Sequence, residues 1–318
     1  MSVTSPLPAA GAEVTKPEEF GAMARLSARA ADYLEIAKPR ISLMVLVTVS
    51  CGYVLGMESA SISMTLVHAC IGIAVVAFGS SAVNQWVEQK TDARMLRTKN
   101  RPLPSGRLPS SEVLLCGLVA ACLGTAYLAW TVNVPTALAT ASTFVLYAGI
   151  YTPLKRYTSL CTAVGAIPGA LPPVLGWLAA GGHLDMGAFA IFGIMFMWQF
   201  PHFFAIAWMY REDYGRAGLR MLPVKAALPH VTGLMAVAYA LGLIPISILP
   251  SLYGLAGGVY AAVALVLGVI YLAASALFAW KETRSSARRL LLVSLVYLPL
   301  LLLTLVWDHL RLLDRLSI

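Results

Sequence analysis

The sequence predicts an all-α, polytopic membrane protein, and three observations carry this prediction. Only 12% of the 318 residues are charged and 59% are hydrophobic, whereas soluble domains carry about 25% charged residues. The mean hydropathy is +0.76. Apolar stretches of about 20 residues, long enough to cross a bilayer core as a helix, recur along most of the chain. This composition excludes an ordinary soluble domain.

Nine apolar stretches are separated by charged or turn-forming segments, and each is predicted to be a transmembrane helix. The connecting segments alternate between short, weakly charged sequences such as "TVNVP" and strongly basic ones. The chain is therefore expected to form a bundle of nine transmembrane helices. The predicted spans are Ile41–Met57, Ile62–Val83, Val113–Thr131, Val134–Tyr151, Leu160–Ala180, Met186–Tyr210, Val231–Pro250, Tyr253–Trp280 and Leu290–Trp307.

The basic residues predict the orientation of the bundle, because cytoplasmic loops carry an excess of Lys and Arg. Of the 23 basic residues, 21 fall in the N-terminal segment and in every second loop, and only Arg311 and Arg315 fall on the other side. We expect a multi-pass protein of the cell membrane (the inner membrane of a bacterium) with a cytoplasmic N-terminus and an external C-terminus. Because this topology explains the net charge of +8, nucleic acid is not expected as a partner.

Residues 1–38 are predicted to form a cytoplasmic tail. They contain no apolar core of the kind that marks a cleavable signal peptide. From Met23 to Lys38, apolar residues recur at near-helical spacing, which indicates a short helix at the membrane interface. Residues 39–310 then form a single transmembrane domain, and residues 311–318 an external C-terminal tail.

Three oxygen-bearing side chains follow the second span with a spacing of four residues. On a helix that continues from this span, Asn84, Glu88 and Asp92 lie on one face and drift by about 40° per step. Such a stripe suits Mg²⁺, which takes few protein ligands and completes its coordination with water and substrate phosphate. The alternative is an ordinary solvated loop with acid–base pairs along a helix.

The residues after this stripe are basic and suit a phosphate group. Guanidinium forks bind phosphate oxygens in pairs, so acids for a metal beside bases for phosphate predict a diphosphate site. The positive-inside bias alone is the competing explanation for these bases. They are Arg94, Arg97, Lys99, Arg101 and Arg107.

Two further spans place polar residues at the same predicted inner face. Tyr151, Lys155 and Arg156 stand at the end of the fourth span, where a topology signal with an interfacial aromatic residue is an equally good interpretation. In the fifth span, "GAIPGALPPVLGW" contains helix breakers, which are tolerated where helices pack closely or line a cavity.

The sixth span ends with acids followed by bases, which repeats the order seen after the second span. Glu212 and Asp213 come first, and Arg216, Arg220 and Lys225 follow. Four spans separate the two clusters, which hints at two four-helix halves that face one another. His202 lies deeper in the sixth span. A membrane-embedded histidine is a functional candidate, although a hydrogen bond to a neighbouring helix would also explain it.

Four segments resemble the protohaem IX farnesyltransferase branch of the UbiA-type intramembrane prenyltransferase superfamily. The run "RTKNRPL" and the segment "PHFFAIAW…REDY" point to the haem branch rather than to quinone or chlorophyll prenyltransferases. The match covers nearly the whole chain apart from the N-terminal tail. Its segments are "AKPRISLMVLVTVSCGYVLG", "NQWVEQKTDARMLRTKNRPLPSG", "YTPLKRYTSLCTAVGAIPGALPPVLGW" and "QFPHFFAIAWMYREDYGRAGLRMLPV".

This resemblance implies a nine-helix bundle around a central cavity that opens to the cytoplasmic side and laterally to lipid. It also implies an enzyme that uses Mg²⁺ to transfer a farnesyl group from farnesyl diphosphate to a vinyl group of haem b, with addition of water. The product would be haem O, and the partner proteins would be those of haem A synthesis or terminal-oxidase assembly. The lipid bilayer would surround the apolar substrates.

The resemblance also assigns roles to individual residues. Asn84, Glu88, Asp92, Glu212 and Asp213 are expected to be catalytic, and all of these except Glu212 are expected to hold the metal. His202 is the candidate for haem binding. Diphosphate is expected to bind to Arg40, Arg97, Lys99, Arg101, Tyr151, Lys155, Arg156 and Lys225.

The chain departs from the superfamily pattern at two positions. Glu88 stands where the wider superfamily has Asp, and Ala217 stands where a second Asp would complete the Asp-x3-Asp motif that begins at Asp213. The second departure puts a full second pair of metal ligands in doubt. A related prenyltransferase for an aromatic acid or quinone precursor, and a membrane transporter, remain the competing functions.

Overall fold

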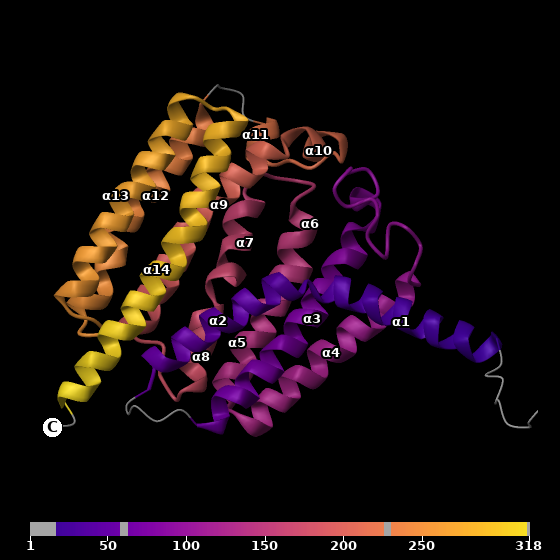
Figure 1. Cartoon of the computed structure of the whole chain (residues 1–318), viewed down its shortest axis with the longest axis horizontal. Coiled ribbons are helices and arrows are strands. Elements are labelled where there is room, and N and C mark those ends of the chain that lie inside the picture. Colours follow the sequence, from indigo (N-terminus) through magenta and orange to yellow (C-terminus); the bar gives the residue numbers. More distant parts are fainter. Residues whose placement is uncertain (1–16, 58–62, 226–229, 317–318) are drawn as a thin grey trace, which may run out of the picture.

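A computed structural model describes residues 17–57, 63–225 and 230–316, and within these ranges the secondary structure is entirely helical. Figure 1 shows the helices as a bundle, with α1 extending to one side. The helices are α1 Pro17–Ala37, α2 Pro39–Leu55, α3 Met64–Asp92, α4 Ser110–Thr131, α5 Val134–Phe144, the π-helical η1 Val145–Tyr151, α6 Thr152–Leu154, α7 Cys161–Ala170, α8 Pro172–Ala179, α9 Met186–Met209, α10 Arg211–Arg216, α11 Leu222–Lys225, α12 Val231–Leu252, α13 Gly258–Trp280 and α14 Arg284–Leu316.

Eight helical stretches in the described ranges are long and apolar enough to cross a membrane. They correspond to the second through ninth predicted spans, with α5, η1 and α6 together forming one stretch and α7 and α8 another. The first predicted span forms α2, which has 17 residues and falls just short of that length. The class of the fold is therefore confirmed as a helical membrane bundle, whereas the count of nine is not.

The fifth predicted span breaks where its sequence carries two prolines. α7 ends at Ala170 and α8 starts at Pro172, with Leu171 between them. Because proline lacks a backbone N–H and clashes with the preceding turn, Pro172 and Pro173 interrupt the ladder of hydrogen bonds. The predicted fourth span changes in a different way, since its last turns widen into the π-helix η1, which ends at Tyr151. Such widened turns often occur at functional sites.

Glycines allow α2 and α8 to touch backbone to backbone. A Cβ atom added to Gly52 would lie 1.8 Å from the Pro173 carbonyl oxygen, and one added to Gly176 would lie 1.8 Å from the Val49 carbonyl oxygen. Small residues at crossings are the usual means of close helix packing in membranes. The glycines of the fifth span therefore serve packing, as the sequence indicated.

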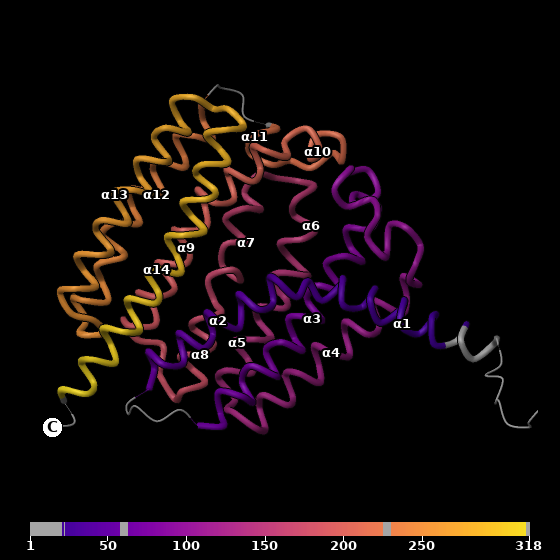
Figure 2. The backbone as a smooth tube through the Cα atoms, viewed as in Figure 1, coloured from indigo at the N-terminus to yellow at the C-terminus, as the bar shows by residue number. Residues whose placement is uncertain are grey.

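The long helices pack in two groups. The first consists of α2, α3, α4, α5 and α8, and in the second α9 packs against α12 and α14, which both pack against α13. Figure 2 shows the second group along one side of the bundle, and α7 bridges the groups through its contacts with η1 and α9. The two groups place the ends of α3 and α9 at the same end of the molecule, beside α10 and α11 (Figure 1).

The N-terminal segment forms a longer helix than the sequence predicted. α1 starts at Pro17 and packs against α3, and Arg29 pairs with Glu112 of α4 at 2.5 Å. Its exposed apolar side chains include Met23 and Leu26. At the other terminus α14 runs through Leu316, so the described part of the predicted external tail continues the last helix.

Candidate active site

The predicted stripe lies on a single buried helix. α3 continues beyond the apolar span as far as Asp92, so Asn84, Glu88 and Asp92 are each one turn apart. Their exposed fractions are only 1%, 8% and 1%. Buried charged and polar groups need partners, because an unpaired one is costly to keep away from water. The solvated-loop interpretation is therefore wrong for these three residues.

Glu88 lies at the centre of a set of short polar contacts. Its Oε1 accepts a hydrogen bond from Lys155 Nζ at 2.8 Å, which is also an ion pair. Its Oε2 accepts one from Asn84 Nδ2 at 3.1 Å. The same amide nitrogen donates to Thr152 Oγ1 at 3.0 Å, and that hydroxyl donates to the Tyr147 carbonyl oxygen at 2.7 Å. The stripe is thus tied to the fourth span.

Asp92 has a separate cationic partner in the α3–α4 connection. Arg101 Nη1 lies 2.7 Å from Asp92 Oδ2. Thr98 Oγ1 donates to the Asp92 carbonyl oxygen at 2.9 Å, which ties the connection to the end of α3. Each carboxylate of the stripe therefore has one basic side chain against it, so a compact set of acids and bases alternates along this surface.

Lys155 is placed by the widened end of the fourth span. Its ammonium lies 4.3 Å from the centre of the Tyr151 ring, a cation–π contact. Burial favours the neutral amine, but Tyr151 and the Glu88 carboxylate outweigh this, so the pKa of Lys155 is raised well above its ordinary value. The carbonyl oxygen of Lys155 accepts a hydrogen bond from Arg220 N at 2.9 Å. Lys155 is therefore a charged group held at the site.

Lys38 also lies at the site, although from the sequence alone it was only one of the basic residues that predict the orientation of the bundle. Its Nζ donates to Asn84 Oδ1 at 3.3 Å. Lys38 links α1 to α2 with a left-handed backbone, φ 48°, a conformation that is uncommon for residues other than glycine. The dipeptide Lys38–Pro39 was the feature of the sequence that could have indicated an unusual backbone at Lys38, since proline restricts the residue before it. Thr152 was also missed, because nothing in its sequence marks it as a partner of Asn84.

The other predicted phosphate-binding bases are more exposed. Arg97 lies over the Tyr210 ring at 5.0 Å, and Arg156 Nη2 donates to the Val87 carbonyl oxygen at 2.7 Å. Arg40 and Lys99 are exposed. The side chain of Lys225, which ends α11, lies outside the described part of the structure. Of the predicted set, Lys155 and Arg101 touch the acidic stripe.

The second acidic region is not joined to the stripe. Asp213 forms an ion pair with Arg216 of the same helix, and Glu212 is exposed. Within the described ranges no three His, Cys, Asp or Glu side chains gather as a metal site, so Asp213 does not meet Glu88 and Asp92. Ala217 is buried with Met95 and Leu219 in an apolar cluster. That cluster occupies the place of the missing second Asp.

His202 lies on α9, where it faces α14. Its Nδ1 is 2.8 Å from Ser294 Oγ, and its ring stacks on Trp198 with centroids 5.0 Å apart. Trp198 Nε1 in turn donates to the Ser294 carbonyl oxygen at 2.9 Å. His202 thus has the interhelical hydrogen bond that the sequence left open as its alternative role.

The stripe has the donor chemistry that a magnesium ion requires. Two carboxylates and one amide oxygen on adjacent turns supply hard oxygen ligands. Lys38, Lys155 and Arg101 surround them with positive charge suited to phosphate oxygens. An arrangement of this kind can bind a metal–diphosphate complex at the end of an apolar bundle.

Comparison with known proteins places the chain among prenyltransferases. The model of the UbiA prenyltransferase family matches residues 45–305. A protoheme IX farnesyltransferase of Solibacter usitatus is 43% identical over 279 residues, which are 85% of this chain and 96% of that protein. Another from Koribacter versatilis is 42% identical over 288 residues, covering 87% and 93%.

Solved structures share the fold. One is a structure from work on the biosynthesis of digeranylgeranylglyceryl phosphate synthase in membranes. Its TM-score is 0.76 at 15% identity, and the match covers 89% of this chain and 99% of that one. A UbiA homolog from Archaeoglobus fulgidus bound to GPP and Mg²⁺ has a TM-score of 0.63 at 17% identity, covering 86% and 99%. The chain therefore belongs to the UbiA prenyltransferase family.

Proposed function

We propose that the protein transfers the farnesyl group of farnesyl diphosphate to a vinyl group of haem b, with addition of water, to give haem O and diphosphate. The relatives named protoheme IX farnesyltransferase, 33–43% identical over most of the chain, support the donor and the acceptor. The observation that carries the reaction type is the buried Asn84–Glu88–Asp92 stripe with Lys155 and Arg101 against its carboxylates.

Mg²⁺ would be held by Asn84, Glu88 and Asp92, whose oxygens fit a hard cation. When bound, the ion neutralises charge on the departing diphosphate. Lys155 and Arg101 balance the carboxylates in the structure. We propose that they turn to the phosphate oxygens of the donor once metal and substrate are present, because a guanidinium or ammonium between carboxylate and phosphate can bind either.

The remaining basic residues would hold the outer oxygens of the diphosphate. Lys38 lies beside Asn84 and joins the predicted set at this end of the bundle. Neutralising the leaving group lowers the barrier to breaking the allylic C–O bond, since charge develops there in the transition state. With Arg101, Lys155 and Tyr151 included, the proposed diphosphate-binding set is Lys38, Arg40, Arg97, Lys99, Arg101, Tyr151, Lys155, Arg156 and Lys225.

The farnesyl carbocation would form in an apolar interior that opens to the cytoplasmic side. Breaking the allylic C–O bond leaves the electron pair on diphosphate, and the vinyl carbon of haem b then forms the new C–C bond. Water adds to the resulting cation beside the porphyrin ring and releases a proton. Tyr147 and Tyr151, whose rings lie 5.5 Å apart, offer aromatic faces to a carbocation near the stripe.

Glu212, Asp213 and His202 have supporting roles in this proposal. Asp213 and Glu212 lie on α10, directly after α9, where a second ion or a bound water would reach the diphosphate. Asp213 would first release Arg216. His202 would orient the acceptor from the α9–α14 contact, where it already has Ser294 as a partner.

The same proposal includes the orientation of the protein in the cell membrane. The stripe end of the bundle faces the cytoplasm, the C-terminus is external, and α2 crosses the bilayer as the first of nine spans. α1 lies at the interface, in keeping with its exposed Met23 and Leu26. The domain limits stay at 1–38, 39–310 and 311–318. Proteins of haem A synthesis or terminal-oxidase assembly would take the product.

A panel of acceptors tests the proposal. Purified protein in lipid is supplied with farnesyl diphosphate, Mg²⁺ and, in turn, haem b, an aromatic acid and a quinone precursor. Farnesylation of haem b alone is expected. Farnesylation of one of the other acceptors would make the protein a different prenyltransferase, and counterflow in liposomes without release of diphosphate would make it a transporter.

A further inference from the structure

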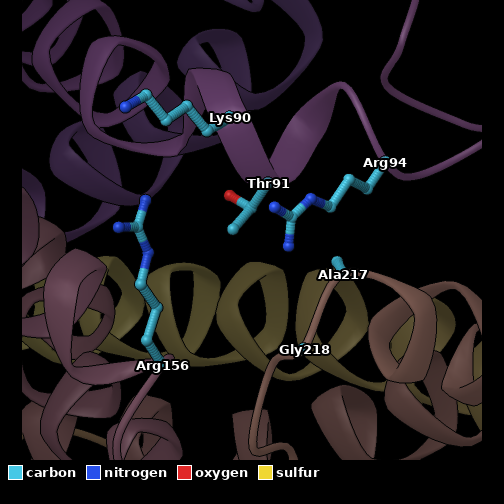
Figure 3. A pocket seen from close by; sticks show the side chains of 6 residues that line it. All are labelled: Lys90, Thr91, Arg94, Arg156, Ala217 and Gly218. Carbon is cyan, nitrogen blue, oxygen red and sulfur yellow. The ribbon is translucent and has the colours of Figure 1, made fainter.

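A small cationic pocket lies beside the stripe, on the other side of α3. Its volume is about 290 Å³, and it is lined by Lys90, Thr91, Arg94, Arg156, Ala217 and Gly218. Figure 3 shows the guanidinium groups of Arg94 and Arg156 pointing into it from the end of α3 and from the α6–α7 connection. The pocket is thus built by three segments that are far apart in the sequence.

The position of the pocket follows from helix geometry. Lys90 and Arg94 each come two residues after a carboxylate of the stripe, Glu88 and Asp92. Two residues turn a helix by about 200°, so Lys90 leaves α3 on the side opposite Glu88. Arg94 follows Asp92, the last residue of α3, in the connection to α4. The last turn of α3 therefore separates the carboxylates of the stripe from the bases of the pocket.

The positive charge of the pocket is not balanced by its own lining. Its three charged residues are basic, and none of the six lining residues is an acid. The carboxylates nearest along α3, Glu88 and Asp92, are occupied by Lys155 and Arg101. Within the described residues, Lys90, Arg94 and Arg156 take part in none of the ion pairs that form between side chains. The pocket consequently attracts an anion.

One wall of the pocket is fixed and the other leaves room. Arg156 is held in place by its hydrogen bond to the Val87 carbonyl oxygen at 2.7 Å. On the opposite side, Gly218 has a left-handed backbone, φ 73°, and a Cβ built there would meet no atom within 4 Å. A compact anion therefore has space between a preset guanidinium and a wall of small residues.

We propose that Lys90 and Arg94, together with Arg156, which the pocket shares with the donor site, form a second binding site for inorganic diphosphate, the water-soluble product of the reaction. This inference rests on the proposed function for the source of the anion. The pocket is small and has no aromatic wall, which suits a compact phosphate group better than the carboxylate edge of a porphyrin. Lys155 contacts the stripe, and the next residue in the chain, Arg156, lines the pocket. A diphosphate released at the stripe therefore has a second cationic site next to it.

Binding without magnesium separates the two sites. In the structure Lys155 and Arg101 are paired with the carboxylates of the stripe, so without Mg²⁺ these two cations do not compete for the anion. Calorimetric titration of inorganic diphosphate into the full-length protein in Mg²⁺-free detergent solution therefore reports on the bases outside these pairs, and the comparison of wild type with K90Q/R94Q isolates the pocket. Because neither donor nor acceptor is present, the result does not depend on whether farnesyl transfer to haem is correct.

The double variant K90Q/R94Q is expected to weaken this binding by about tenfold or more, the loss that follows when charge-assisted hydrogen bonds are removed. R288Q/R289Q is the matched control, because it removes two exposed charges near the start of α14 and is expected to bind as wild type does. Equal binding by wild type and K90Q/R94Q, or equal losses in both double variants, would overturn the proposal.

Two further arms identify the anion. In the transfer assay K90Q should weaken product inhibition by inorganic diphosphate and leave the KM for farnesyl diphosphate unchanged. A raised KM for the acceptor with unchanged diphosphate binding would assign the pocket to acceptor carboxylates instead. Loss of wild-type binding in phosphatidylglycerol bilayers, but not in neutral ones, would assign it to a lipid headgroup. The single variants K90Q and R94Q, each with a partial loss, replace the double variant if it does not fold.

Discussion

Lys155 Nζ and Glu88 Oε1 lie 2.8 Å apart, and this pair joins the end of the fourth predicted span to the middle of the acidic stripe. The contact spans 67 residues of sequence and both side chains are largely buried. It brings a metal-ligand candidate and a phosphate-ligand candidate into direct contact. The pair therefore organises the site before any substrate is present.

Breaking this pair from one side should destabilise the fold. In K155M the Glu88 carboxylate stays buried without its cation, and removing one partner of a buried ion pair costs about 3–5 kcal/mol. Thermal unfolding in detergent measures the effect. The double variant K155M/E88Q is the control, and it should recover much of the loss because it leaves no uncompensated charge. A double variant as unstable as K155M would contradict this account.

The stability contributed by Lys155 should not change with pH near neutrality. Its pKa is raised in the folded protein, so its contribution is complete below the ordinary lysine pKa of about 10.4 and is lost as the pH rises through the folded value. The difference in Tm between wild type and K155M should therefore be the same at about pH 6.5 and about pH 9. A difference that shrinks over this interval would mean that the pair titrates there.

The carboxylates of the stripe should be needed for turnover, in addition to the stability that their ion pairs with Lys155 and Arg101 contribute. E88Q and D92N keep the size of each side chain but remove the charge that would hold Mg²⁺, and the loss of such electrostatic stabilisation lowers kcat by about 100-fold or more. The measurement is farnesyl transfer over a range of Mg²⁺ concentrations. E212Q is a comparison in the second acidic region, where the side chain is exposed. Near-normal transfer by E88Q and D92N at low Mg²⁺ would remove the stripe from the mechanism.

Lys38 offers a way to separate binding from stability. Its left-handed backbone favours glycine, and a strained residue of this kind costs about 1–3 kcal/mol. K38G should therefore fold at least as stably as wild type while it binds farnesyl diphosphate more weakly, because the amine beside Asn84 is gone. K38R retains a cation and should bind more tightly than K38G. Unchanged binding by K38G would exclude Lys38 from the site.

The crossing of α2 and α8 should not tolerate a side chain. G52A places a Cβ 1.8 Å from the Pro173 carbonyl oxygen, and backbone cannot move aside as a flexible side chain can. The yield of folded protein and its Tm should fall sharply. G149A is the matched control, since a Cβ at Gly149 meets nothing within 4 Å. Equal Tm values for both variants would show that the two helices can separate freely.

Local helix geometry explains which parts of the site were predictable. The spacing of Asn84, Glu88 and Asp92 determines a shared face once the helix continues, and α3 does continue to Asp92. The helix breakers of the fifth span were visible for the same reason, because proline acts on its own turn, although the span itself was predicted as one helix from Leu160 to Ala180. The family was also recognisable from the segments around these residues.

Contacts between distant segments were not predictable in the same way. Lys38 reaches Asn84 only because the turn between α1 and α2 directs it there, and no periodicity encodes that turn. Ala217 was noted as a missing ligand, yet its role in an apolar cluster with Met95 depends on how two connections meet. The length of α2 also depends on the turns at its two ends, and the periodicity of the sequence does not define these turns.

The most direct test of the central claim is the mass of the haem product formed in water enriched in heavy oxygen. Wild-type protein in lipid, supplied with haem b, farnesyl diphosphate and Mg²⁺, is predicted to give a haem that carries one farnesyl group and one heavy oxygen atom. Both additions should be absent with E88Q. Unmodified haem b beside hydrolysed farnesyl diphosphate, or a farnesylated haem in the E88Q reaction, would contradict the account.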